Sequence, residues 1–284
     1  MAKTVVVFDF DKTIIDCDSD NWVIEEMGVD DLFKELLRTM PWNPTMDRMM
    51  GELHSMGKTT DEIADVMKGA PLDPRVISAI KAAYAFGCDV RIVSDANLFF
   101  IVTILEHHGL LHCFTEINTN PSFVDENGRL NIRPYHNTHN CPLCPPNMCK
   151  GLIIERIQSE IAGNDRCMVY LGDGKGDYCP SLKLGHGDHV MPRKLYPLWD
   201  LIQVDPSLLK ATIHEWSDAG ELEAKLLNIL RDNEKKEEFT YESNGFVEES
   251  LSDRLLSSVV DCKSESITGP VLEAPLPPIL RVTQ

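Results

Sequence analysis

The stretch from Val5 to Thr13 constrains the fold of this chain more than any other. It places an apolar run, Val5 to Phe8, directly before two acidic residues, Asp9 and Asp11, that are one residue apart. A continuous apolar run of this kind predicts a buried strand of a parallel sheet. In open α/β sheets, ligands bind beyond the carboxyl ends of the strands. We therefore expect Asp9 and Asp11 to face a functional site.

Two neighbouring carboxylates at the end of a strand favour a divalent cation. Burying carboxylates a few ångströms apart costs free energy. Hard cations such as Mg²⁺ remove most of that cost, because they bind carboxylate, water and phosphate oxygens. The alternative is that the two acids only cap the next helix. Because Asp9 and Asp11 follow an apolar strand and precede Thr13, we predict a Mg²⁺ site.

Composition and charge limit the possible partners. The chain has 284 residues, 43% of them hydrophobic and 25% charged, which is typical of one large globular domain or two smaller ones. The net charge of −18 argues against nucleic acid and anionic membranes. Because we find no apolar run long enough to span a bilayer and no signal-peptide pattern, we expect a cytoplasmic protein.

Three later positions can be compared with the first motif. Ser94 ends a predicted strand, Lys150 opens a predicted helix, and the loop Gly172 to Asp177 follows another predicted strand. Taken alone, the serine is more typical of a helix cap and the lysine of a solvated surface. Taken in order with Asp9 to Thr13, they resemble the four motifs of the haloacid-dehalogenase (HAD) superfamily of aspartyl-phosphate phosphatases.

Longer stretches are similar to the phosphoethanolamine/phosphocholine phosphatase family, and most similar to its plant members, some of which are induced by phosphate starvation. The similarity covers Thr4 to about Leu230 and is strongest in Asp9–Asp16, Asp18–Trp22, Ile92–Asn97, Cys144–Lys150 and Gly172–Pro180. Related proteins are described as acting on phosphocholine and phosphoethanolamine, on inorganic pyrophosphate, or on thiamine monophosphate. The resemblance implies a Mg²⁺-dependent phosphatase with a small substrate.

The resemblance also implies roles for the acidic residues. Asp9 is expected to attack phosphorus and form an aspartyl-phosphate, and Asp11 to act as general acid and then as general base. Mg²⁺ is expected to bind Asp9, Asp173 and the backbone carbonyl of Asp11. Asp177 is expected to hold metal-bound water or to orient the metal ligands.

Four further residues are expected to contact the substrate. Ser94 and Lys150 correspond to the motif residues that bind phosphate oxygens. Asp20 and Asp95 resemble the family's acidic residues that face the leaving group, although helix capping is the alternative role for both. Acids there attract an ammonium or choline cation, so we expect phosphocholine or phosphoethanolamine. Inorganic pyrophosphate carrying a second Mg²⁺ and thiamine monophosphate stay as alternatives.

The pattern of elements predicts an α/β fold: a Rossmann-like HAD core with a parallel sheet flanked by helices. Between the first strand and the next α/β unit, apolar residues recur at spacings of three and four, which predicts a small helical cap. We expect the core in residues 1–15 and 72–230 and the cap in residues 16–71. Residues 231–284 are rich in Ser, Glu and Pro, which predicts an acidic, disordered tail.

Cysteines form a separate feature. Cys141 and Cys144 form a C-x-x-C motif, with His139 before it and Cys149 after it. Such spacing occurs in structural zinc sites, but these need a second pair of ligands. We therefore expect free thiols in a proline-stiffened loop, with zinc binding as the alternative. A zinc-binding or phosphate-sensing interaction protein is accordingly the alternative to an enzyme.

Overall fold

The computed structural model of the chain describes residues 4–161 and 166–243. The described residues up to Leu230 form one compact unit, and those from Arg231 to Ser243 belong to a second. Among the described residues, no helix combines the length and the apolarity that crossing a bilayer requires.

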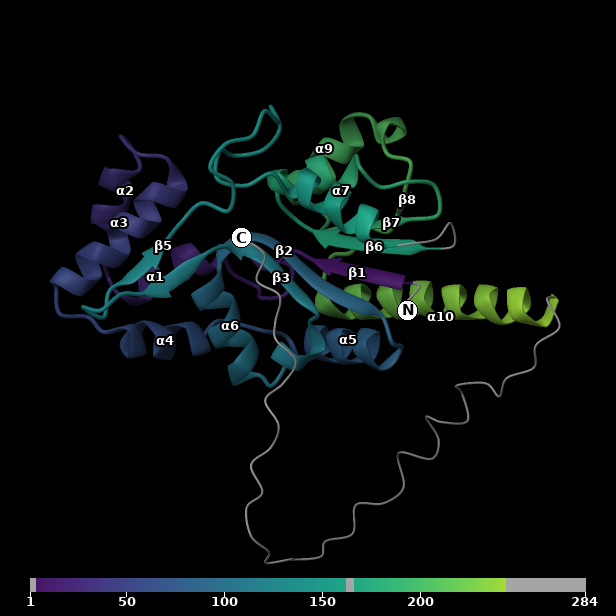
Figure 1. Ribbon diagram of the computed structural model, residues 1–284, viewed down its shortest axis with the longest axis horizontal. Helices are drawn as coiled ribbons and strands as arrows, with labels where there is room; N and C mark the ends of the chain where they lie inside the picture. The colour runs from purple at the N-terminus through teal and green to yellow at the C-terminus, as the bar shows by residue number, and fades with distance from the viewer. Residues whose placement is uncertain (1–3, 162–165, 244–284) are drawn as a thin grey trace, which may run out of the picture. The chain divides into compact units, whose positions relative to one another are not determined.

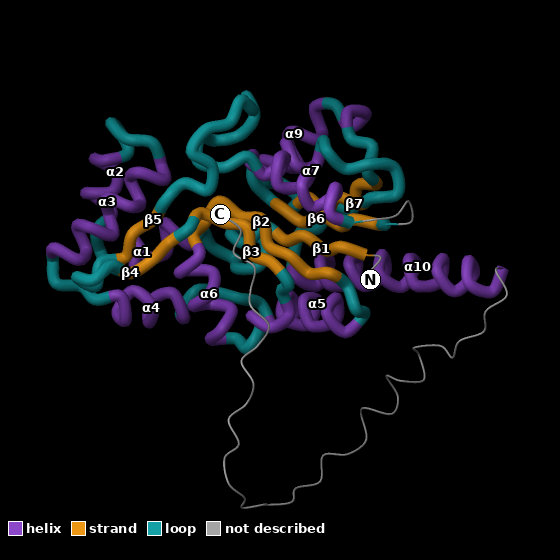
Figure 2. Tube along the Cα trace, in the orientation of Figure 1, coloured by secondary structure: helices purple, strands orange, loops and turns teal. Residues whose placement is uncertain are grey.

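A six-stranded parallel sheet forms the centre of the first unit (Figures 1 and 2). Its strand order is β3-β2-β1-β6-β7-β8. The strands are β1 (Thr4–Phe8), β2 (Asp89–Asn97), β3 (Glu116–Asn120), β6 (Cys167–Gly172), β7 (His189–Pro192) and β8 (Thr212–Ile213). The strand order reverses between β1 and β6, and ligands bind at such a switch point in open α/β sheets. The sheet confirms the predicted α/β fold.

The two faces of β1 explain its continuous apolar sequence. Val6 and Phe8 belong to the core shared with α5 (Pro74–Ala85) and α6 (Leu98–His107). Val5 and Val7 belong to the core on the opposite face, where α7 (Lys150–Glu160) and α9 (Pro197–Val204) pack. Figure 1 shows these helices on the two sides of the sheet. A strand covered on both faces needs apolar side chains in both directions.

A helical insertion follows β1, as predicted. It comprises α1 (Ser19–Glu26), α2 (Asp30–Leu36), α3 (Trp42–Ser55) and α4 (Thr60–Lys68). The hairpin of β4 (Ser122–Val124) and β5 (Leu130–Ile132) contacts α3. Asp47 of α3 accepts a hydrogen bond from the backbone N–H of Ile132 at 2.8 Å. The insertion is therefore tied to the segment that follows β3, while the division into a core and a cap at the predicted boundaries stays a prediction.

Short helices complete the first unit, and α10 (Ala219–Ser243) extends past it. The short helices are η1 (Leu111–Cys113), η2 (Lys175–Asp177), α8 (Tyr178–Ser181) and η3 (Pro206–Leu208). The prediction of a disordered tail from residue 231 was wrong for residues 231–243, which are helical. These residues are rich in Glu and Lys, which are good helix formers. The rest of the predicted tail, residues 244–284, lies outside the described residues.

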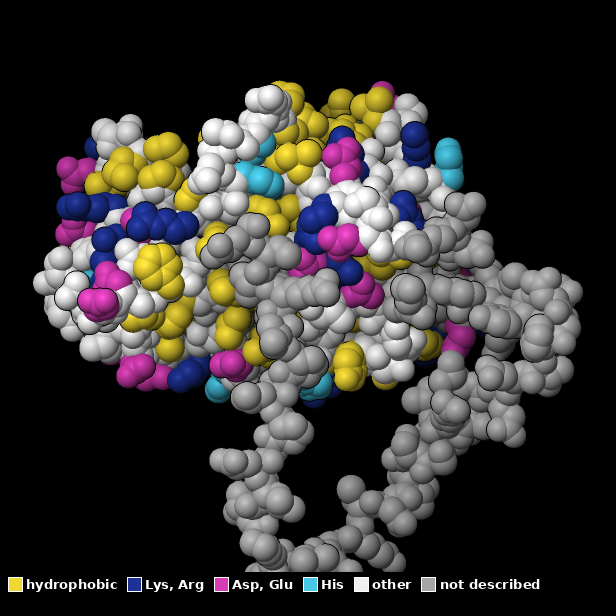
Figure 3. Space-filling view, viewed as in Figure 1, with side chains coloured by type: hydrophobic (Ala, Val, Ile, Leu, Met, Phe, Trp, Pro, Cys, Tyr) yellow, Lys and Arg dark blue, Asp and Glu magenta, His cyan; other side chains and the backbone are white. Residues whose placement is uncertain are grey.

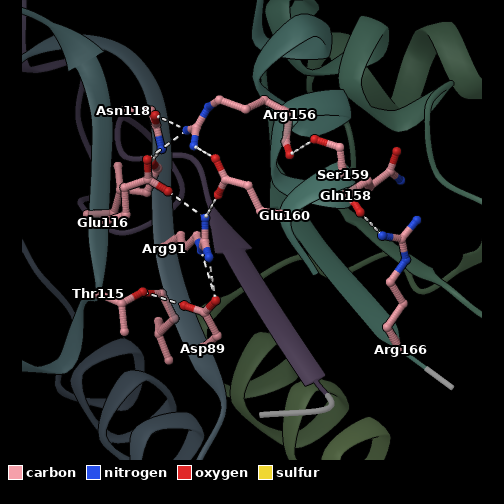
Figure 4. A network of polar contacts seen from close by, with 12 residues as sticks. Asp89, Arg91, Thr115, Glu116, Asn118, Arg156, Gln158, Ser159, Glu160 and Arg166 are labelled. Carbon is pink, nitrogen blue, oxygen red and sulfur yellow. Dashed lines mark hydrogen bonds and ion pairs between the residues drawn. The ribbon is translucent and has the colours of Figure 1, made fainter. Parts of the chain in front are cut away.

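A polar network fastens α7 to β2 and β3 (Figure 4). The Arg156 guanidinium donates to Glu116 and to Asn118, each at 2.7 Å. The other carboxylate oxygen of Glu116 accepts from Arg91 of β2 at 2.5 Å. Charge-assisted hydrogen bonds of this kind are the stronger ones in proteins. The network fixes the position of α7, whose first residue is Lys150.

Candidate active site

The carboxyl ends of β1 and β6 bring the first and fourth motifs together. Phe8 pairs with Leu171 across these strands, so Asp9 directly follows one strand and Asp173 lies two residues beyond Leu171. The backbone N–H of Asp9 donates to the carbonyl of Leu171 at 2.9 Å. Carboxylate oxygens of Asp9, Asp173 and Asp177 lie within 4.8 Å of one another. The parallel register therefore assembles three buried acids.

Lys150 inserts its ammonium group among these acids. Its Nζ atom lies 2.9 Å from Asp9 Oδ1, 2.8 Å from Asp177 Oδ1 and 3.8 Å from Asp95 Oδ1. Burial acts to lower the pKa of Lys150, but the carboxylates of Asp177 and then Asp9 outweigh it and hold that pKa well above its usual value. Lys150 is therefore a buried, permanent cation at the start of α7.

Asp177 is held in place by its neighbours in the fourth motif. Its Oδ2 atom accepts the backbone N–H of Asp173 at 3.1 Å and that of Gly174 at 2.9 Å. Its Oδ1 atom accepts the Tyr170 hydroxyl at 2.7 Å. A Cβ atom at Gly172 would lie 2.5 Å from Asp177 Cγ, so this approach requires a glycine. Asp177 consequently orients the loop that carries Asp173.

The acids carry more negative charge than Lys150 neutralises. Burial and then the Asp177 carboxylate raise the pKa of Asp9 well above its ordinary value, and the same two causes raise the pKa of Asp173 to about 7. Carboxylates that repel one another are the ligand set that a hard divalent cation binds. Asp9 and Asp173 therefore fit Mg²⁺ as ligands. Both carboxylate oxygens of Asp177 already accept hydrogen bonds, and the carboxylate of Asp11 lies outside this group of three.

Asp11 is placed to handle a proton. Its Oδ2 atom accepts the Ser19 hydroxyl at 3.0 Å, and its Oδ1 atom is buried without a hydrogen-bond partner in the described part of the chain. Burial, followed by the charges of Asp18 and Asp20, raises the pKa of Asp11 well above its ordinary value. A carboxyl group whose pKa is raised keeps its proton to higher pH and can donate it to a leaving oxygen.

A cavity of about 590 Å³ opens above these residues. Its wall includes Asp9, Asp11, Lys12, Asp18, Asp95, Lys150, Asp173, Lys175, Asp177, Tyr196 and the segment 142–145. Six of these residues were predicted from sequence: Asp9, Asp11, Asp95, Lys150, Asp173 and Asp177. Sequence analysis gave no role in the site to Lys12, Asp18, Lys175 or Tyr196, and expected Asp18 or Ser19 only as a cap of the next helix. Lys12 and Lys175 lie inside the first and fourth motifs, and this position was the signal that could have found them.

Ser94 and Asp20 lie outside the wall of this cavity. Ser94 is fully buried, and its hydroxyl oxygen accepts the backbone N–H of Ala96 at 3.3 Å. Asp20 is buried in α1 and accepts a hydrogen bond from Trp42 Nε1 at 2.7 Å. Burial and then the charge of Asp18 raise the pKa of Asp20 to about 8.

Helix capping was the alternative role for Ser94, Asp20 and Asp95. In the structure other residues cap the two helices concerned. Asp18 is the N-cap of α1 and accepts the backbone N–H of Asn21 at 2.9 Å. Asn97 is the N-cap of α6.

Comparison with known proteins finds a matching family and several similar proteins. The family model described as Putative Phosphatase matches residues 4–230. Inorganic pyrophosphatase 2 of Arabidopsis thaliana is 57% identical over 247 residues, 84% of this chain and 88% of that protein. Inorganic pyrophosphatase 1 of the same plant is 52% identical over 287 residues, 97% of this chain and 93% of that protein. Phosphoethanolamine/phosphocholine phosphatase of Homo sapiens is 31% identical over 241 residues, 81% of this chain and 90% of that protein.

Solved structures share the fold. A phosphoserine phosphatase described as a phospho-aspartyl intermediate analogue superposes with a TM-score of 0.50 and 19% sequence identity. The match covers 75% of this chain and 93% of that chain. At this identity the likeness concerns the fold alone.

Proposed function

The chain belongs to the Putative Phosphatase family of HAD-type phosphatases, and from this premise we propose that it hydrolyses a small phosphate substrate through a phosphorylated Asp9. The observation that carries the proposal is the contact of 2.9 Å between the Lys150 ammonium and the Asp9 carboxylate. It lies at the switch point of the sheet and inside the cavity. A carboxylate and a cation so placed can attack and hold a phosphoryl group.

The first step transfers the phosphoryl group to Asp9. A carboxylate oxygen of Asp9 forms a bond to phosphorus while the bond from phosphorus to the leaving oxygen breaks. Asp11 gives its proton to that leaving oxygen. Lys150 holds a non-bridging oxygen and offsets its charge. Ser94 is the proposed second contact because it lies in β2, two residues beyond Ile92, which pairs with Phe8 at the end of β1.

The second step returns Asp9 to its free form. Asp11, now ionised, takes a proton from a water molecule whose oxygen attacks phosphorus, and the bond from phosphorus to Asp9 breaks. Mg²⁺ bound by Asp9 and Asp173, with Asp177 orienting the loop, would supply charge stabilisation for the transferred group. The products are inorganic phosphate and the dephosphorylated leaving group.

Inorganic pyrophosphate is the first candidate substrate. Lys12 and Lys175 add two cations to Lys150 in the cavity wall, and a substrate with two phosphoryl groups needs such charge. The similarity to two proteins named inorganic pyrophosphatases supports this choice. The expectation of phosphocholine depended partly on Asp20, which is buried outside the cavity wall.

Phosphocholine or phosphoethanolamine is the second candidate. Asp18 and Asp95 lie in the cavity wall and could attract the cationic leaving group of either substrate. The similarity to a human phosphatase with that name supports it. The same two acids would also favour the cationic ring of thiamine monophosphate.

The test compares phosphate release from pyrophosphate, phosphocholine, phosphoethanolamine and thiamine monophosphate, each with and without Mg²⁺. We expect Mg²⁺-dependent release, with pyrophosphate giving the highest kcat/KM, and loss of at least about 10³-fold in Asp9→Asn. Turnover that persists in Asp9→Asn would rule out the nucleophile assignment. A higher kcat/KM for phosphocholine or thiamine monophosphate would replace the first candidate without changing the mechanism.

A further inference from the structure

Four cysteine thiols from two separate segments of the chain lie close together beside the active site. Cys141, Cys144 and Cys149 come from the segment between β5 and α7, and Cys179 comes from α8. The four sulfur atoms lie within 4.8 Å of one another, and Cys141 Sγ is 3.5 Å from Cys179 Sγ. All four are free thiols, since a disulfide bond would bring two sulfur atoms to about 2.05 Å.

We propose that these four cysteines bind one structural zinc ion as thiolates. Zinc prefers four tetrahedral ligands in structural sites, with bonds of about 2.3 Å to sulfur, which places the sulfur atoms about 3.8 Å apart. The separation of Cys141 and Cys179 is 3.5 Å and all others are at most 4.8 Å, so shifts of about an ångström or less would bring the sulfur atoms to this spacing. Four soft thiolate ligands in a tetrahedron favour zinc over harder cations such as Mg²⁺.

The residues around the four cysteines leave room for the sulfur atoms and provide groups that can interact with thiolates. A Cβ atom at Gly151 would clash with Cys179 Sγ, so the second residue of α7 has to be glycine for Cys179 to approach. The backbone N–H of Leu152 donates to the Cys149 sulfur. Lys183, whose ammonium pairs with Glu155 at 2.7 Å, lines the same cavity as Cys141, Cys149 and Cys179. Positive charge and N–H donors around thiolate ligands are the usual surroundings of such metal sites.

His139 is a possible zinc ligand from the sequence alone, but in the structure its ring makes hydrogen bonds within the loop. Its Nδ1 atom accepts the backbone N–H of Cys141 at 3.2 Å, and its Nε2 atom donates to the carbonyl of Pro145 at 2.7 Å. Both ring nitrogens are therefore engaged in holding the loop. The fourth ligand is Cys179, which sequence spacing could not identify because 29 residues separate it from Cys149.

The proposed zinc site connects three parts of the active site. Cys149 directly precedes Lys150, Cys179 lies two residues after Asp177, and Cys144 is part of the cavity wall. A metal that ties these cysteines together would fix the wall segment 142–145 against the third and fourth motifs. Because all four positions of the zinc would be filled by cysteines, its role is structural and separate from that of Mg²⁺.

The test measures zinc and iron in the full-length protein by elemental analysis, after expression with zinc and gel filtration under reducing conditions. We expect about one zinc and no stoichiometric iron per chain in the wild type and in Cys88→Ser, a cysteine outside the cluster. We expect zinc to be lost in Cys141→Ser and in Cys179→Ser. Cobalt added to metal-free protein should give the intense sulfur-to-cobalt absorption of a tetrahedral thiolate site.

Three results would overturn the proposal. They are wild-type protein without zinc even after incubation with equimolar Zn²⁺, stoichiometric iron in place of zinc, or zinc content unchanged in both Cys141→Ser and Cys179→Ser. If both variants fail to fold, the cobalt spectrum of the wild type decides. A spectrum without sulfur-to-cobalt absorption contradicts the site, and one with it supports the site. None of these measurements depends on phosphatase activity.

Discussion

At the scale of single residues, the site is organised by one buried cation among several buried acids. Lys150 contacts Asp9 and Asp177 at 2.9 and 2.8 Å, and all three side chains are almost fully buried. Removing one partner of a buried ion pair costs more than the pair contributes, because the remaining charge is left without compensation. The residues that carry the proposed chemistry are therefore also expected to determine stability.

Replacing Lys150 with methionine should impair both phosphate release and the stability of the fold. We expect Lys150→Met to abolish phosphate release and to lower the free energy of unfolding by about 3–5 kcal/mol without Mg²⁺, because Asp9 and Asp177 lose their counter-charge. Urea denaturation measures the change. The control is Lys210→Met, an exposed lysine that should change stability by less than about 0.5 kcal/mol. Equal effects in the two variants would contradict the buried ion pair.

Asp20 should make stability depend on pH. Its pKa is raised to about 8, above the value of about 3.9 in an unfolded chain. Between these values the folded protein holds a proton that the unfolded chain lacks, so the stability contributed by Asp20 is lost as pH rises from about 4 to 8. We expect Asp20→Asn to be more stable than the wild type at pH 8, by about 2–5 kcal/mol, and similar at pH 4.

Thermal unfolding at pH 4, 6 and 8 tests the prediction for Asp20. The control is Asp31→Asn, which changes an exposed acid on α2 and should keep the pH dependence of the wild type. If Asp20→Asn showed the same fall in Tm with rising pH as the wild type, another group would have to be responsible.

At the scale of elements, the strand ends and the start of α7 position the chemistry. The network of Arg156, Glu116, Asn118 and Arg91 holds α7 on β2 and β3 (Figure 4). Lys150 lies at the first turn of the same helix. A shift of α7 would therefore move the cation away from Asp9.

Breaking this network should affect catalysis at a distance. We expect Arg156→Met to lower the free energy of unfolding by about 1–3 kcal/mol, because the buried carboxylate of Glu116 loses one of its partners. We also expect kcat to fall by roughly tenfold as Lys150 becomes less well positioned. The control is Arg48→Met, which removes an exposed ion pair on α3 and should leave both quantities nearly unchanged. Unchanged kcat in Arg156→Met would show that α7 needs no such support.

The sequence predicted the elements whose signals are local. The apolar strand before Asp9 and the helical spacing after it are periodic patterns, and the four motifs mark strand ends and helix starts. The helix beyond Arg231 was missed because charged residues of good helix propensity resemble a solvated tail. The burial of Asp20 and the position of Cys179 could not be predicted from the sequence. Burial of an acid and the meeting of distant cysteines depend on tertiary packing, which no local pattern encodes.

At the scale of the whole molecule, the charge distribution indicates that a few lysines in one cavity attract phosphate, and that the overall charge of the chain does not. The net charge is −18, and acidic and basic side chains are interspersed on the face seen in Figure 3. Lys12, Lys150 and Lys175 gather in one cavity. A substrate with several negative charges is therefore attracted by these lysines against the charge of the whole chain.

Removing one of these lysines should separate the candidate substrates. We expect Lys175→Gln to raise KM for pyrophosphate about tenfold, because one charge-assisted contact to the second phosphoryl group is lost. KM for phosphocholine should change little, because its leaving group is a cation. Steady-state kinetics on both substrates measure the difference, with Lys210→Gln as the surface control. Equal changes for both substrates would place Lys175 on the transferred phosphoryl group.

The proposed role of Asp9 is to carry the phosphoryl group during turnover. Its most direct test is rapid acid quenching of the full-length enzyme during turnover of ³²P-labelled substrate with Mg²⁺, followed by mapping of the label to a peptide. We expect label on the peptide that contains Asp9, and none in Asp9→Asn. Turnover without any labelled protein, or label on a peptide that lacks Asp9, would contradict the account.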